Sequence, residues 1–385
     1  MQRNEGTLKR WVFCISLIIG SLVACSHNVS DTNPETIQPL YVALTQAAAT
    51  LRTTITSPEP TSGVMTYPQS GEIIEPENAN SLSPSMVLSH ADAYSVAFLP
   101  DGNRVILLGA TGLSAFDLSQ AGSEFARAES LSIPMVVSQP SLMNIARDSA
   151  IVAWVDNDKS IDVWNFADPE GARTLADFDV SVTGMALSPD GERITVSTYD
   201  NVLRTWESTF GESPKEWRAP SWLINLSYSP DKKYVGGADP GSFRVFIFEA
   251  ENGKVQRTLE WLNSASPVLY GAYFSPDWKY IAWIARGSAQ ILELESGKYG
   301  PLLNHEDFIN AVAWSPDGRL LTVATAATVN GNMVPVVILW DALSGDQLSS
   351  LSQSAPIVSM AFSPDGKRLA ILDDNGELQM LSIKK

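Results

Sequence analysis

The sequence predicts an all-β protein, a seven-bladed β-propeller of four-stranded antiparallel blades, over residues 81–385. A phrase centred on Ser-Pro-Asp recurs along this region, as in VAFLPDGNRVILL from Val96 and VAWSPDGRLLTVA from Val312. Its turn aspartates follow one another at intervals of 40 to 48 residues, 44 on average, which is the length that one four-stranded blade needs. These aspartates are Asp101, Asp148, Asp190, Asp231, Asp277, Asp317 and Asp365.

Each repeat has the pattern of four short strands. Apolar residues alternate with polar ones on both sides of Ser-Pro-Asp-Gly, which predicts two half-buried strands joined by a tight hairpin. Proline presets φ at the first corner of that turn, and glycine suits the left-handed position that closes it. A third strand follows, such as SIDVWNF up to Phe166, and a small turn such as Ser296-Gly297 leads into a fourth.

The two ends of the repeat region predict how the ring closes. After Asp365 only two more strands fit before Lys385, so the last blade lacks its outer strand. Met86-Val87-Leu88 comes directly before the first repeat and has no blade of its own. We therefore expect this N-terminal strand to pair with the last blade and to cover its open edge.

The start of the chain has the pattern of an export signal. About 13 mostly apolar residues, from Trp11 to Val23, follow three basic residues, whereas a helical membrane span needs about 20. The sequence Leu22-Val23-Ala24-Cys25 resembles the lipobox of bacterial lipoproteins. That resemblance implies removal of residues 1–24 and a lipid anchor on Cys25, and so a membrane-anchored, extracytoplasmic protein. An ordinary signal peptide that happens to end in cysteine is the alternative.

Residues 25–80 are predicted to be a flexible tether. They are rich in Ser, Thr, Pro, Asn and Glu and show little apolar periodicity. Within them, residues 35–53 carry apolar residues at three- and four-residue steps, which indicates a possible short helix. That helix either has no function of its own or lies on the membrane or self-associates.

Composition narrows the class of partner. The mature chain would hold no thiol besides Cys25, because the other cysteine, Cys14, lies in the signal. The formal net charge is -17, which argues against binding to a nucleic-acid backbone and favours basic protein partners. The sequence leaves the oligomeric state open.

The repeats resemble the WD40 (WD-repeat) family. Trp340-Asp341 is a complete Trp-Asp pair, and Trp164-Asn165 and Trp206-Glu207 are near copies at the end of a third strand. The resemblance implies a structural role inside the blades for tryptophans, for histidines before first strands and for aspartates six residues ahead of the tryptophan position. The residues that match are Trp164, Trp206, Trp340, His90, His305, Asp158, Asp200 and Asp374.

Motifs of catalysis and of metal binding are incomplete in this chain. HEDFI from His305 begins like a zinc-protease helix motif but ends in Ile309. DNDKSID from Asp156 and DDNGE from Asp373 could offer oxygens to calcium, yet neither continues into a full calcium loop, and both fit turns between strands. We therefore expect no catalytic residue, no metal and no cofactor.

The resemblance also implies a binding surface where loops enter the first strands around the channel. Tyr94, Trp222, Tyr270 and Phe308 align near that entrance, and aromatic residues are enriched at binding hot spots. The sequence thus predicts a non-catalytic platform for protein–protein interaction. The alternatives are an enzyme or a carbohydrate- or ligand-binding module that uses the channel mouth, and a lipoprotein of envelope assembly.

Overall fold

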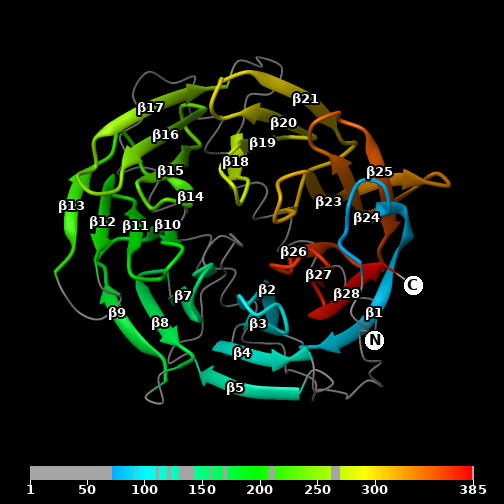
Figure 1. Cartoon of the computed structure of the whole chain (residues 1–385), viewed down its shortest axis with the longest axis horizontal. Coiled ribbons are helices and arrows are strands. Elements are labelled where there is room, and N and C mark those ends of the chain that lie inside the picture. Colours follow the sequence, from blue (N-terminus) through cyan, green and yellow to red (C-terminus); the bar gives the residue numbers. More distant parts are fainter. Residues whose placement is uncertain are drawn as a thin grey trace, which may run out of the picture.

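The computed structural model describes residues 72–383, apart from 91, 110–111, 119–122, 130–142, 157, 168–170, 208–212 and 262–268. Over these residues the chain forms seven four-stranded antiparallel sheets, which stand around a central axis as the blades of a propeller (Figure 1). The predicted fold class is confirmed. The blades are numbered 1 to 7 in chain order from residue 93.

Each blade runs outward from the axis in sequence order, except that β1 completes blade 7. The innermost strands of blades 1 to 7 are β2 (Ala93–Phe98), β6 (Met143–Ile145), β10 (Val182–Leu187), β14 (Ile224–Tyr228), β18 (Leu269–Phe274), β22 (Ala311–Trp314) and β26 (Ile357–Phe362). The second strands are β3 (Arg104–Gly109), β7 (Ile151–Asp156), β11 (Ile194–Thr198), β15 (Tyr234–Asp239), β19 (Tyr280–Ala285), β23 (Leu320–Val329) and β27 (Arg368–Asp373). The third strands are β4 (Gly112–Asp117), β8 (Ser160–Asn165), β12 (Val202–Trp206), β16 (Arg244–Glu249), β20 (Ser288–Glu293), β24 (Asn332–Asp341) and β28 (Glu377–Ile383). The outer strands are β5 (Ser123–Glu129), β9 (Arg173–Asp177), β13 (Lys215–Arg218), β17 (Val255–Glu260), β21 (Tyr299–Asn304), β25 (Gln347–Ser352) and β1 (Leu82–Ser89).

The Ser-Pro-Asp turns are closed by their own side chains. In blade 3, Ser188 Oγ donates to Asp190 Oδ1 over 2.6 Å, and the backbone N–H of Arg193 donates back to Ser188 Oγ over 2.9 Å. The serine–aspartate bond recurs in blades 4 to 7 at 2.6 to 2.7 Å. The left-handed position is Gly191 in blade 3, but Lys232 in blade 4 and Trp278 in blade 5. Side-chain hydrogen bonds within the turn therefore fix its shape even where glycine is absent.

The hydrophobic core lies between blades rather than within one blade. The cluster between blades 4 and 5 joins Val245 and Ile247 of β16 to Ile281 and Trp283 of β19, and Trp283 has no exposed surface. A single four-stranded sheet would leave both of its apolar faces open to water. Each blade therefore needs a neighbour on both sides, and a break anywhere in the ring exposes two apolar faces.

The N-terminal strand closes the ring as predicted. Strand β1 pairs antiparallel with β28, so that Met86 lies opposite Met380 and Leu88 opposite Leu378. Met86 is 2% exposed, while its neighbour Val87 is 39% exposed and faces away from the core. Blade 7 thus joins the N-terminal part of the described chain to its C-terminal part, and the edge of β28 is covered.

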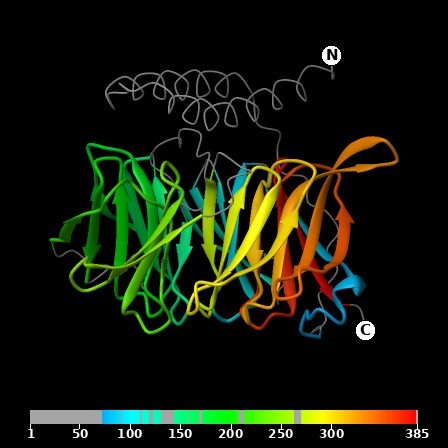
Figure 2. The same ribbon diagram turned by 90° about the horizontal axis from the view of Figure 1, so that it is seen from above.

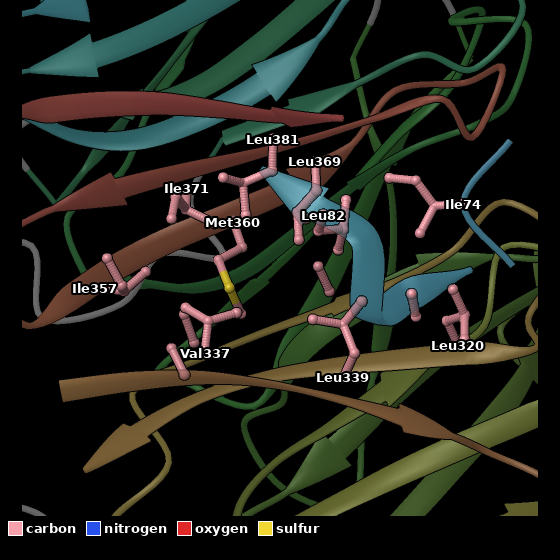
Figure 3. Close-up of a cluster of buried hydrophobic side chains, with 14 of the residues drawn as sticks. Ile74, Leu82, Leu320, Val337, Leu339, Ile357, Met360, Leu369, Ile371 and Leu381 are labelled. Atoms are coloured by element: carbon pink, nitrogen blue, oxygen red, sulfur yellow. The ribbon is translucent and has the colours of Figure 1, made fainter. Parts of the chain in front are cut away.

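The packed region begins earlier than the sequence indicated. We expected the tether to continue to residue 80, but residues 72–81 lie against blades 6 and 7. Ile74 is buried in the cluster between these blades, together with Leu82, Leu339 and Leu369 (Figure 3). Its backbone N–H donates to Gly366 O of the blade 7 turn over 2.9 Å. We call residues 72–81, with the 3₁₀ turn η2 (Ala79–Ser81), the strap. The predicted signal, lipid anchor, short helix and residues 25–71 of the tether lie outside the described residues.

The ring has two different faces. Inter-blade loops and the turns between second and third strands form one face, which we call the loop face. The Ser-Pro-Asp turns and the turns between third and fourth strands form the other, the turn face. In blade 6 the strands β23 and β24 have ten residues each and continue beyond the body as a hairpin (Figure 2). Its turn residues Asn330 and Gly331 both have positive φ, as a two-residue hairpin turn requires.

Candidate functional site

Two of the predicted binding residues meet on the loop face. Tyr270 comes from β18 of blade 5, and Phe308 comes from the loop that leads into β22 of blade 6. Their rings meet edge to face with centroids 5.8 Å apart. The guanidinium carbon of Arg286, in the turn between β19 and β20, lies 4.8 Å from the centre of the Phe308 ring. We call Tyr270, Arg286 and Phe308 the mouth cluster.

The mouth cluster is fixed to the blade by a hydrogen bond on one side, and its arginine is exposed on the other. Thr325 Oγ1 donates to the backbone oxygen of Phe308 over 3.0 Å, which fixes the loop against β23. Burial raises the pKa of Tyr270, and the nearby charge of Arg286 opposes that rise. Arg286 is exposed, and no carboxylate in the described parts of the chain forms a salt bridge with it. The cluster therefore presents aromatic surface and an unpaired cation side by side.

The other two predicted binding residues lie apart from this cluster. Trp222, in the loop between blades 3 and 4, stacks on Tyr199 with ring centroids 4.9 Å apart. Tyr94, in β2, is half-buried and packs against the core between blades 1 and 2. Sequence reasoning missed Arg286 and Tyr199, although both lie in turns on the loop face and could have been found by marking those turns.

His90 connects two polar side chains in an arrangement like a hydrolase triad. Its Nε2 lies 3.2 Å from Ser114 Oγ, and its Nδ1 lies 2.7 Å from Asp92 Oδ1. The ring also meets Phe116 edge-on at 5.9 Å. Ser114, however, is only 2% exposed, in the middle of β4, so a substrate has no approach to its hydroxyl. The geometry fits a bond that ties the loop before β2 to the third strand of blade 1.

A serine-directed probe should distinguish these two roles of Ser114. We expect a fluorophosphonate to leave the folded protein unlabelled, because the hydroxyl is buried. Replacing the serine, Ser114→Ala, should lower the free energy of unfolding by about 1 kcal/mol through the lost hydrogen bond. Mass spectrometry after probe treatment and chemical denaturation measure the two effects, and stoichiometric labelling at Ser114 would contradict a structural role.

His305 occupies the corresponding place in blade 6. Its ring meets Trp340 edge-on with centroids 5.4 Å apart, and neither ring nitrogen has a hydrogen-bond partner among the described residues. Burial lowers its pKa from 6.5 to about 4, so the folded protein holds the neutral ring. The sequence around it, HEDFI, thus places a half-buried packing residue here.

The depressed pKa of His305 predicts a loss of stability in mild acid. As the pH falls below 6.5 the unfolded chain takes up a proton that the folded chain refuses until about pH 4. The free energy of unfolding should therefore fall by about 2 kcal/mol between pH 7.5 and 5 through this residue alone. Urea denaturation of the wild type and of His305→Phe at both pH values measures it. An equal drop in both proteins would show that His305 does not cause it.

The remaining predicted structural residues lie in their blades as follows. The side chains of Trp164, Trp206 and Trp340 are each at most 8% exposed. Asp200 accepts from Thr198 Oγ1 and from Arg204 Nη2, and Arg204 also binds Glu216 over 2.9 Å, so this network joins three strands of blade 3. Burial raises the pKa of Asp158 to about 6 in the turn between β7 and β8. Asp374 lies in the turn before β28, where its neighbour Asp373 accepts from the backbone N–H of Glu377 over 2.8 Å.

Within the described part of the chain, no group of three or more His, Cys, Asp or Glu residues is arranged to hold a metal ion. No helix in that part is long and apolar enough to cross a membrane. In the acidic turn at Asp373, Oδ1 of Asp373 accepts from the backbone N–H groups of Asn375 and Glu377.

The loop face carries most of its charge as carboxylates. Its described loops and turns hold seven acidic residues and two basic ones. The acidic residues are Asp92, Asp158, Asp179, Asp200, Glu306, Asp307 and Asp374, and the basic ones are Lys159 and Arg286. The hairpin of blade 6 stands among them without charge, since no charged residue occurs from Leu320 to Trp340. At its end Val329 and Met333 are 38% and 52% exposed.

A known family of repeat proteins matches part of the repeat region. The sequence model of the WD40 family (WD domain, G-beta repeat) matches residues 172–207 and 298–331. These two stretches of the chain are similar in sequence to WD40 repeats. Each match starts at an outer strand, β9 or β21, and continues into the next blade, so the repeat unit links neighbouring blades.

Relatives from several organisms align with about half of the chain or less. Periodic tryptophan protein 2 of Arabidopsis thaliana is 22% identical over 51% of this chain and 21% of its own length. Protein groucho of Drosophila melanogaster is 27% identical over 49% of this chain and 26% of its own length. The Serine-threonine kinase receptor-associated protein of Bos taurus is 27% identical over 37% of this chain and 40% of its own length. The chain thus spans less than half the length of these relatives.

A solved structure shares the fold. The β-propeller domain of Cps50 (Swd1) from Myceliophteria thermophila superimposes with a TM-score of 0.65. The match covers 79% of this chain and all of that domain, at 13% sequence identity. At that identity the similarity concerns the fold and carries no function with it.

Proposed function

We propose that this chain is a WD40-repeat propeller that serves as a non-catalytic docking platform for a protein, anchored by lipid on the extracytoplasmic side of a membrane. The relatives support the docking role by name in one case, a receptor-associated protein. The sequence Leu22-Val23-Ala24-Cys25 supports the anchor.

The mouth cluster is the observation that carries the docking role. Its half-buried rings need little ordering on binding, since Phe308 is already held by Tyr270, Arg286 and the backbone bond from Thr325. Preformed aromatic and arginine side chains of this kind contribute most of the binding energy at protein interfaces. The carboxylates around the cluster favour a partner whose contact surface is basic.

Capture from a membrane fraction tests the docking role. The tagged full chain should recover one partner or a few reproducibly, and Phe308→Ala or Arg286→Ala should reduce recovery at least about tenfold. Leu343→Ala is the matched control, because Leu343 is 52% exposed but lies on the turn face. Higher salt should slow association with a basic partner. Recovery that is unchanged by both mouth variants would contradict the proposal.

The anchor has a separate test. Replacing the acceptor of the lipid, Cys25→Ser, should move the protein from the detergent phase of a Triton X-114 partition to the aqueous phase, since stable anchoring needs acyl chains. The matched control is Cys14→Ser, whose cysteine lies in the apolar run and which should stay in the detergent phase. Detergent partition of the Cys25→Ser protein would contradict a lipid on that sulfur.

A further inference from the structure

The channel has a cavity at the turn face, away from the mouth cluster. It encloses about 150 Å³ and is lined by residues of four consecutive blades, 2 to 5. Asn144 and Arg147 come from blade 2, Tyr228 from blade 4, and Phe274 and Trp278 from blade 5. Aliphatic side chains such as Leu187 and Leu226 complete the wall. Drug-sized ligands need cavities of about 300 Å³ or more. This cavity is therefore large enough only for a smaller molecule or for one chain end.

Arg147 crosses this cavity. It stands where the other repeats have the proline of Leu-Pro-Asp or Ser-Pro-Asp, in the divergent turn Ala146-Arg147-Asp148 of blade 2. Its Nη1 donates to the backbone oxygen of Pro276, in the turn of blade 5, over 2.7 Å. No carboxylate in the described segments forms a salt bridge with it. A guanidinium has five N–H donors, so most of its donor capacity remains open.

The opposite wall is fixed by a residue in an unusual backbone conformation. Trp278 holds the left-handed turn position with φ of 58°, where blades 1, 3, 6 and 7 have glycine. Its ring stacks on Phe274 with centroids 4.6 Å apart, and its Nε1 donates to Ser227 Oγ over 3.0 Å. A non-glycine residue rarely adopts this region, and here the hydrogen bonds of the turn hold it. The indole is therefore locked as a flat apolar wall.

Several acceptors of the cavity already hold one hydrogen bond each, whereas most N–H donors of Arg147 remain open. Asn144 Oδ1 accepts from the backbone N–H of Leu187 over 3.2 Å. The bond uses the oxygen of the amide and leaves its NH₂ group to donate to another partner. Ser227 Oγ already accepts from Trp278, and the Pro276 oxygen already accepts from Arg147. Tyr228 Oη pairs with Thr195 Oγ1 over 2.6 Å. A ligand that only accepts hydrogen bonds and carries negative charge fits this set.

We propose that this cavity binds a carboxylate that carries a short apolar group. Arg147 and Asn144 hold the carboxylate, and Trp278, Phe274 and Leu226 cover the apolar group. The group comes either from a small free acid or from the C-terminal residue of a peptide, since both offer the same chemistry. The site is independent of docking at the mouth cluster, because it opens on the opposite face and shares no residue with it.

Titration calorimetry of the chain from residue 26 onward tests the site. The first probe is phenylacetate, and its control is phenylacetamide, which has the same shape without the charge. A second pair is a pentapeptide ending in valine with a free carboxylate and the same peptide amidated. We expect each acid to bind at least about tenfold more tightly than its amide, because a charge-assisted bond to arginine is lost in the amide. Tighter binding of phenylacetate would identify a small free acid as the source of the carboxylate, and tighter binding of the peptide would identify a peptide C-terminus.

Variants test the residues that we assign. Arg147→Gln should weaken binding of the acid at least about tenfold, and Asn144→Asp should abolish it by placing a carboxylate beside the ligand. Arg319→Gln is the matched control, since Arg319 lies in the equivalent turn of blade 6 and does not line the cavity. Thermal melting shows whether each variant is folded. Equal affinity for acid and amide, an unchanged affinity in folded Arg147→Gln, or no binding of either acid would overturn the proposal.

Discussion

Removal of residues 72–89 is expected to abolish the stable monomer. These residues form the strap and the closing strand β1, and they contribute Ile74, Leu82, Met86 and Leu88 to the core, each at most 7% exposed. Burying a large aliphatic side chain stabilises a protein by about 1.5 to 3 kcal/mol, so these four contribute about 6 to 12 kcal/mol. That is as large as the whole free energy of unfolding of an ordinary domain, about 5 to 15 kcal/mol.

The loss should also change how the protein behaves in solution. Without β1 the edge of β28 is unpaired, and an open, regular edge recruits other strands. We expect circular dichroism to show no cooperative melt of a monomer and light scattering to show aggregation. A cooperative melt within a few degrees of the full chain would contradict the proposed closure.

Two single substitutions in β1 give a matched control for this deletion. Met86→Asp places a carboxylate in the core, where Met86 is 2% exposed, and should lower the melting temperature sharply. Val87→Asp places the same group one residue along, where the side chain is 39% exposed, and should have little effect. Because adjacent residues of a strand face opposite sides, the comparison separates the loss of core packing from a general effect of charge in β1.

Gly236→Ala is expected to destabilise the protein by about 3 kcal/mol, which is large for one methyl group. Gly236 lies in β15, and a Cβ there would stand 2.2 Å from Cζ of Phe274 in the next blade. The Phe274 ring is 9% exposed and is held on its other side by the stacked indole of Trp278. Neither the ring nor the strand can retreat without breaking the packing between blades 4 and 5. Urea denaturation measures the change.

Two comparisons make this prediction specific. Gly331→Ala, at the tip of the blade 6 hairpin, meets nothing within 4 Å and should cost only about 1 kcal/mol through its positive φ. Adding Phe274→Leu to Gly236→Ala should restore part of the loss, because the smaller side chain makes room for the methyl group. If the double variant loses the full sum of the two single effects, the clash with Phe274 is not the cause.

The parts of the fold that depend on neighbouring residues could be predicted from the sequence. The Ser-Pro-Asp turns are set by hydrogen bonds within five residues, as between Ser188 and Arg193, so the sequence pattern contains their geometry. The closing strand could be predicted because the last blade is one strand short and Met86-Val87-Leu88 is one strand too many. The hairpin of blade 6 has an Asn-Gly turn at residues 330–331 that could have located it.

Contacts between blades could not be predicted in the same way. Arg147 reaches Pro276 across 129 residues of sequence, and Ile74 is buried in the same cluster as Leu369 although nothing near Ile74 has strand periodicity. Arg286 gains its place in the mouth cluster only because Phe308 of the next blade comes under its guanidinium. These contacts depend on how blades are placed around the ring, which a local pattern does not contain. The assignment of Tyr94, Trp222, Tyr270 and Phe308 to partner binding stays a prediction.

Site-specific photo-cross-linking in intact cells tests the docking role most directly. A photoreactive amino acid at position 308 should join the chain to one discrete partner, and Arg286→Ala should remove that product. The same amino acid at position 343, where the side chain is 52% exposed but lies on the turn face, should give no such product. Discrete cross-links from position 343 with none from position 308 would contradict a platform that binds its partner on the loop face.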